Sequence, residues 1–115
     1  MSRASPDASA AKRRLHAGAF AALGDETRLA LIAALSAGEQ RSIAQLTGGT
    51  RLTRQAVTKH LRVLEQAGIV HCARSGREQR YGLDPAPMKE LEEYLRRVSE
   101  QWDNVLLRLK AFVEA

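Results

Sequence analysis

A run of apolar residues near the C-terminus, spaced alternately three and four positions apart, constrains the fold more than any other feature. The run consists of Met88, Leu91, Leu95, Val98, Trp102, Val105, Leu109 and Phe112. This spacing is that of a heptad seam on one face of a helix. A helix over residues 87–114 would be about 42 Å long at 1.5 Å per residue, longer than the rest of so small a chain can cover.

Part of this seam therefore needs a partner other than its own domain. Because a large exposed apolar patch is unfavourable in water, we expect it to pack against a second copy. The alternative is that the helix folds back wholly onto the first two helices of its own chain. Trp102 is expected to be an interface anchor rather than part of a ligand pocket. The residues predicted at the dimer interface are Leu15, Phe20, Leu91, Leu95, Val98, Trp102, Val105, Leu109 and Phe112.

The N-terminal half is predicted to form short helices. Residues 1–11 are rich in Ser and Ala and lack large apolar side chains, so we expect a flexible tail. Residues 12–115 are predicted to form a single domain, which begins with a helix over 12–23. Asp25 is a suitable N-cap for a second helix, whose expected buried stripe is Leu29, Ile32 and Leu35.

A third, short helix begins at Ser42, and a fourth runs from the N-cap Thr53 to Ala67. On the fourth helix an apolar stripe, at Val57, Leu61 and Leu64, turns one face toward the core. The opposite face carries long polar and cationic side chains, namely Gln55, Thr58, Lys59, Arg62 and Gln66. A short helix, a turn and a helix with such a face are the arrangement that places side chains in a DNA major groove.

Two extended runs follow, over 69–74 and 79–83, around a turn that contains glycine. They predict a β-hairpin with Arg74 and Arg77 at or near its tip and Arg80 on one face. The fold expected is mainly α with a small β-hairpin: a winged helix-turn-helix with a long C-terminal dimerisation helix.

The positive charge is concentrated in the middle of the chain. The whole chain has 18 Lys and Arg against 13 Asp and Glu, a net charge of +5, and residues 51–80 alone hold seven basic and two acidic residues. A compact basic block predicts a polyanionic partner, with double-stranded DNA the leading candidate. The alternative is a basic surface that serves only solubility.

The residues expected to contact DNA lie on the fourth helix and on the hairpin. Arg54 and Gln55, in the first turn of the helix, are long enough to reach base edges, whereas Lys59 and Arg62 are better suited to phosphate. The full set is Thr53, Arg54, Gln55, Thr58, Lys59, Arg62, Arg74, Arg77 and Arg80.

Other classes of function have less support. The longest strictly apolar run, Leu29 to Leu35, is far shorter than the roughly twenty residues that cross a bilayer. The single cysteine, Cys72, cannot form an internal disulfide, which fits a cytoplasmic protein. No catalytic constellation or cofactor motif can be assembled, so we expect neither an enzyme nor a cofactor. The main alternative is a protein-interaction module that uses the heptad helix.

Three histidines and one cysteine are the only soft ligands, and they give no reason to expect a metal. His71 and Cys72 are consecutive on a strand and point to opposite faces. His60, at the edge of the core stripe, is expected to make a structural hydrogen bond. Cys72 is expected to be an inert, half-buried thiol, with a redox switch as the alternative.

Three blocks together resemble the ArsR (SmtB/ArsR) winged helix-turn-helix transcriptional regulators: Phe20 to Leu35, Leu52 to Val70 and Gly76 to Leu83. The resemblance extends over residues 15–113. It implies a dimer built from the first and last helices, a recognition helix from Thr53 to Ala67 and a wing from Ile69 to Leu83. It also implies a repressor that binds an inverted repeat near its own promoter.

The sequence departs from this family at its metal-sensing motifs. The stretch Ser42 to Gly48 has no cysteine where metal-sensing members carry a Cys-x-Cys box, and residues 85–115 contain no histidine. Metal sensing through either family site is therefore not expected, and the effector stays open. The stretch Thr47 to Leu52 is also a residue or two longer than is usual in the family.

Overall fold

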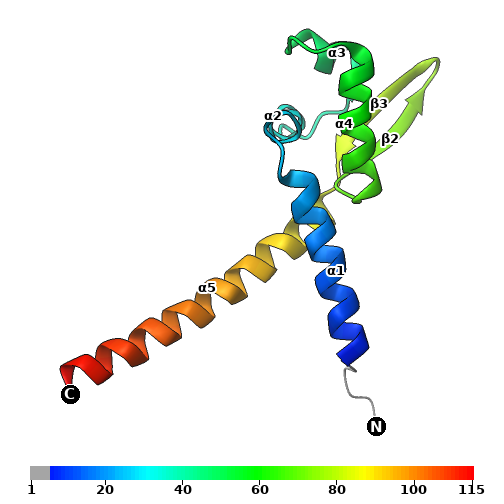
Figure 1. The fold of residues 1–115 in the computed structure, drawn as a ribbon. Helices are drawn as coiled ribbons and strands as arrows, with labels where there is room; N and C mark the ends of the chain where they lie inside the picture. The colour runs from blue at the N-terminus through cyan, green and yellow to red at the C-terminus, as the bar shows by residue number, and fades with distance from the viewer. Residues whose placement is uncertain (1–5) are drawn as a thin grey trace. The chain divides into compact units, whose positions relative to one another are not determined.

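The computed structural model describes residues 6–115, which form two compact units, residues 6–85 and 86–115. The first unit holds four helices and three strands in the order α1(Pro6–Leu23), α2(Glu26–Leu35), β1(Arg41–Ser42), α3(Ile43–Gly48), α4(Arg54–Gln66), β2(Val70–Ser75) and β3(Glu78–Leu83) (Figure 1). The second unit is the long helix α5(Pro85–Glu114), apart from its first residue. A lone helix has no core of its own, so the assignment of 12–115 to one domain stays a prediction.

Helix α1 begins six residues earlier than expected. The prediction of a flexible tail over 1–11 is wrong for residues 6–11, and residues 1–5 lie outside the described part of the chain. Proline suits the first position of a helix, and the alanines that follow have the highest helix propensity. The composition that suggested a tail therefore also favours a helix.

Side-chain caps fix where the next helices begin. The carboxylate of Asp25 accepts a hydrogen bond from the backbone N of Arg28 at 3.0 Å, and this confirms Asp25 as the N-cap of α2. Ser42 and Gln45 form a reciprocal capping box at the start of α3. Each cap satisfies backbone N–H groups that have no partner within the helix.

The core of the first unit lies between α2, α3, α4 and the sheet. Leu35, Val57, Leu61, Leu64 and Ile69 are fully buried, which confirms the predicted stripe of Val57, Leu61 and Leu64 on the fourth helix. The expected stripe of α2 is wrong in one position, because Leu29 is half exposed and Leu31 is buried in its place. On a helix only ten residues long, several assignments of the buried face fit the apolar pattern equally well.

The hairpin is part of a three-stranded antiparallel sheet in the order β1-β3-β2. Its register places Cys72 opposite Tyr81 and Ser75 opposite Glu78, around a turn in which Gly76 has a φ of 64°. The predicted hairpin is confirmed, but strand β1 was not foreseen. Two residues carry no alternating pattern, and β1 forms only because Arg41 and Ser42 pair with Tyr81 and Arg80.

Helix α5 is continuous over 30 residues and begins at Pro85, two residues before the expected start. In the single chain Leu91 is buried, whereas Leu95, Trp102, Val105, Leu109 and Phe112 are exposed. Among the described residues no helix has both the length and the apolar character that a bilayer span requires.

Candidate nucleic-acid interface

The buried face of α4 determines which of its side chains point outward. Thr53 caps the helix, with its hydroxyl accepting a hydrogen bond from the backbone N of Ala56 at 3.1 Å. Val57, Leu61 and Leu64 are fully buried on one side of this helix. With one side held in the core, the rotation of the helix about its own axis is determined.

Arg54, Gln55, Lys59 and Arg62 are exposed, and with Thr58 they line one shallow hollow. Three cations and one amide thus stand on the same face. The hydroxyl of Thr58 donates to the backbone carbonyl of Arg54 at 2.7 Å, so its methyl group is the part available for apolar contact. Guanidinium, amide and methyl groups match guanine, adenine and thymine edges in the major groove.

The turn between α3 and α4 is ordered by its own threonines. The hydroxyl of Thr50 donates to the carbonyl of Thr47 at 3.0 Å and accepts from the backbone N of Leu52 at 3.2 Å. These bonds account for the polar groups of a turn that is longer than usual, and they lead the chain directly into the Thr53 cap.

The arginines of the hairpin differ in their surroundings. Arg74 and Arg77 are exposed beside the Gly76 turn. Arg80 instead donates through Nε to Glu78 Oε2 at 3.2 Å, and its Nη2 lies 3.2 Å from the same oxygen. An exposed ion pair contributes little stability, but it neutralises one of the charges that the sequence assigned to DNA contact.

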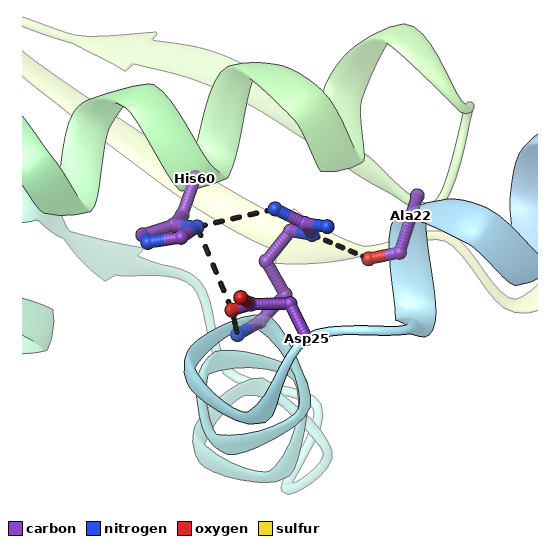
Figure 2. Close-up of polar contacts among 4 residues, drawn as sticks. Ala22, Asp25 and His60 are labelled. Carbon is purple, nitrogen blue, oxygen red and sulfur yellow. Dashed lines mark hydrogen bonds and ion pairs between the residues drawn. The ribbon is translucent and has the colours of Figure 1, made fainter.

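A polar cluster joins the back of α4 to α2, and Figure 2 shows it. Arg28 donates through Nε to the carbonyl of Ala22 at 2.6 Å, and its Nη1 lies 3.3 Å from Nδ1 of His60. Arginine has only donors, so in its contact with Arg28 the Nδ1 of His60 is the acceptor. Asp25 Oδ2 lies 3.7 Å from the same Nδ1. This confirms a structural hydrogen bond for His60.

Arg28 is the residue of this cluster that sequence reasoning missed. It stands within the Phe20 to Leu35 block of the family resemblance, but nothing local shows that its side chain reaches α4. Its backbone N–H donates to Asp25 and is the main reason that the pKa of this carboxyl lies below its ordinary value of 3.8. Half-burial of Arg28 keeps both of its side-chain bonds partly away from water.

Cys72 is half buried and faces the buried Tyr81 across the sheet, whereas its neighbour His71 is exposed. Burial raises the pKa of the Tyr81 phenol above its ordinary value, and Cys72 adds to this rise. His71 has a different polar contact, because its Nε2 lies 3.4 Å from Nε2 of Gln40. No three metal-ligating residues come together in the described part of the chain.

The residues predicted at a dimer interface lie in both units. Leu15 on α1 is 74% exposed and Phe20 is half buried, while Val98 on α5 is half buried. The rest of the α5 seam beyond Leu91 is exposed, as described above. The assignment of these residues to a dimer interface stays a prediction.

The known proteins that are similar to this chain are helix-turn-helix domains and transcriptional regulators. Residues 23–73 match the family described as a helix-turn-helix domain. Over 78 residues the chain is 37% identical to the uncharacterised HTH-type transcriptional regulator YuzN of Bacillus subtilis (strain 168), a match that covers 63% of this chain and 85% of that protein. The fold is similar to that of an ArsR-like transcriptional regulator from Rhodococcus sp. RHA1, with a TM-score of 0.78 and 33% identity over 89% of this chain and 95% of that one.

A further similar fold, with a TM-score of 0.67 and 22% identity, is that of Mb0332 from Mycobacterium bovis. The match covers 91% of this chain and 94% of the other. That structure is described as a homodimeric winged helix-turn-helix DNA-binding domain of a possible ArsR-family regulator.

Proposed function

The chain belongs to the ArsR family of winged helix-turn-helix transcriptional regulators, and from that membership we propose that it represses transcription by binding an inverted-repeat DNA operator as a homodimer. Binding of this kind needs a reading surface, a contact to the DNA backbone and two-fold symmetry.

The observation that carries the proposal is the outward face of α4. Arg54, Gln55, Lys59 and Arg62 are exposed on the face opposite the buried stripe of Val57, Leu61 and Leu64. A major groove admits one helix, whose first turns then face the base edges. In the proposed complex Arg54, Gln55 and Thr58 read bases, and Lys59 and Arg62 contact phosphates.

The wing and the cap support the same orientation. Arg74 and Arg77 stand at the end of the hairpin, where a cation contacts phosphates without reading sequence. Thr53 leaves free backbone N–H groups at the start of α4, which suits a phosphate beside the groove.

Two-fold symmetry would come from the exposed apolar residues of α5 and α1. Leu95, Trp102, Leu109 and Phe112 on α5 and Leu15 on α1 are each more than half exposed in the single chain. The neighbour from M. bovis is described as homodimeric, which supports the same assembly for this chain. A symmetric dimer would read two half-sites about one helical turn, or ~34 Å, apart.

The experiment that tests this proposal is selection of bound duplexes from a random pool by the full chain. We expect an enriched inverted repeat, bound at least ~10³-fold more tightly than random duplex at the same salt concentration. The matched control is the variant Gln55→Ala with Arg54→Ala, which keeps the wing but loses the two longest reading side chains. Equal affinity of the wild type for selected and random duplexes would contradict the proposal.

One observation favours a second candidate function, a protein-interaction module. The exposed apolar face of α5 would suit a partner helix as well as a second copy. The basic outward face of α4 has no role in such a module. The selection experiment separates the two, because an interaction module enriches no sequence.

A further inference from the structure

The hollow between α1, α2 and α4 shares no lining residue with the hollow on the outward face of α4. It has a volume of about 500 Å³, within the range of small-molecule sites. Its lining is mostly apolar, with Leu15, Ala19, Ala22 and Val63 among its walls, and Gln66 adds an amide. Two arginines, Arg14 and Arg28, also line it. Apolar walls beside two cations suit a small organic anion better than a neutral or cationic ligand.

Gly18 opens the floor of this hollow. It lies inside α1, where glycine costs about 1 kcal/mol relative to alanine. A Cβ built on Gly18 would meet no atom within 4 Å, so close packing within the chain does not require a glycine there. The missing side chain instead leaves space that a larger residue would fill.

Arg28 connects the hollow to the reading helix. Within the described residues its Nε is bonded to Ala22 and one N–H of Nη1 to His60 on α4. A guanidinium has five N–H donors, so those left on Nη1 and Nη2 are available to a carboxylate. A carboxylate bound by the remaining N–H groups of these two nitrogens makes charge-assisted hydrogen bonds, which are stronger than the 3.3 Å contact from Nη1 to His60, so a shift of the guanidinium toward the carboxylate lengthens the contact with His60.

We propose that this hollow is an effector site for a small organic carboxylate, held by Arg28 and Arg14, which draws Arg28 away from His60 and so loosens α4 in its DNA-reading position. The effect on DNA rests on the proposed function, whereas the binding site does not. By linkage, a carboxylate that weakens operator binding is itself bound more weakly when operator is present.

The first arm of the test uses no DNA. Full-length protein labelled with ¹⁵N is titrated with sodium benzoate, with benzamide as the neutral probe of the same shape and inorganic phosphate as the anion without an apolar part. We expect saturable shifts of the amide signals of Gly18, Arg28 and Gln66 and of the ring nitrogens of His60, with a dissociation constant of about 1 mM or lower. Benzamide and phosphate should leave these signals unchanged.

Two variants locate the site, and a third variant is the control. Gly18→Leu adds a bulky side chain to the wall of the hollow, where its Cβ meets no atom within 4 Å, and Arg28→Met removes the main donor, so both should abolish the benzoate shifts. Arg13→Gln removes a neighbouring exposed cation of α1 that does not line the hollow and should bind benzoate like the wild type. Thermal unfolding of each variant checks that it is folded.

Several outcomes would overturn the site. These are the absence of saturable shifts, equal shifts with benzamide, and retention of binding in Gly18→Leu.

The second arm measures affinity for the selected duplex. Saturating benzoate should lower it about tenfold in the wild type and in Arg13→Gln but not in Gly18→Leu. Benzoate that binds the hollow while the His60 signals and the operator affinity stay constant would overturn the coupling. If the wild type selects no duplex, the proposed function fails, and the DNA-free arm still decides the site.

Discussion

The hydroxyl of Thr53 accepts a hydrogen bond from the backbone N of Ala56, two residues beyond the first residue of α4, at 3.1 Å. This single bond determines where the reading helix begins. Because Arg54 and Gln55 follow directly, the cap also sets the backbone position of the two side chains best placed to reach bases.

Replacing this cap weakens the start of the reading helix. Thr53→Ala should lower the free energy of unfolding by about 1 kcal/mol, since one orphan N–H loses its acceptor. Thr53→Ser retains the hydroxyl and should stay close to wild type. Urea denaturation measures both, and equal stability of the alanine and serine variants would contradict the role of the cap.

The dimer should depend on the α5 seam. Leu95 and Trp102 are 53% and 61% exposed in the single chain. Changing both to Glu should raise the dimer dissociation constant about 100-fold or more, because a buried unpaired charge costs several kcal/mol. Sedimentation at micromolar concentration measures this, with Arg97→Glu as the control on the same helix. A wild type that sediments only as monomer would show that the seam has another role.

Base reading and phosphate contact should be separable. Gln55→Ala is expected to relax base preference at one position in each half-site, with a cost of about 1–3 kcal/mol for the preferred duplex. Arg77→Ala should weaken selected and random duplexes alike and reduce the slope of log K against log salt by about one for each protomer. Titrations at several salt concentrations measure both, and identical behaviour of the two variants would refute the division.

The ion pair with Glu78 neutralises the charge of Arg80, one of the cations of the wing. Glu78→Gln removes the partner of Arg80, so affinity for random duplex should rise and the salt dependence should become steeper. Stability should change by less than about 1 kcal/mol, since both side chains are partly exposed. Arg80→Gln in the same assay is the matched control, and it should cancel the gain in the double variant.

Acid should weaken the start of α2. The pKa of Asp25 lies below its ordinary value of 3.8 in the folded chain, chiefly through the bond from the Arg28 backbone. The ionised form therefore stabilises the fold above pH 3.8, and this contribution is lost as the pH falls through the lower folded pKa. Asp25→Asn keeps a capping oxygen but does not titrate, so the stability difference between wild type and variant should shrink between about pH 5 and pH 2. A difference that stays constant across this range would contradict the assignment.

Much of the architecture follows from local patterns in the sequence. The stripe of Val57, Leu61 and Leu64 has the period of a helix with one buried face, and the Thr53 cap marks its start, so both the helix and its outward face are predictable. The hairpin follows in the same way from two extended runs around a glycine turn. The α5 helix is predictable because its seam is unbroken from Met88 to Phe112, long enough to exclude other periods.

What the sequence leaves undetermined depends on contacts between distant residues. Strand β1 exists only through its pairing with Tyr81 and Arg80, and the burial of Leu31 in place of Leu29 depends on which side of α2 meets α4. The Arg28–His60 bond joins residues 32 positions apart, and the hollow beside it takes its walls from three helices. Local periodicity reports the face that a residue presents, whereas partners and hollows arise only when the elements pack.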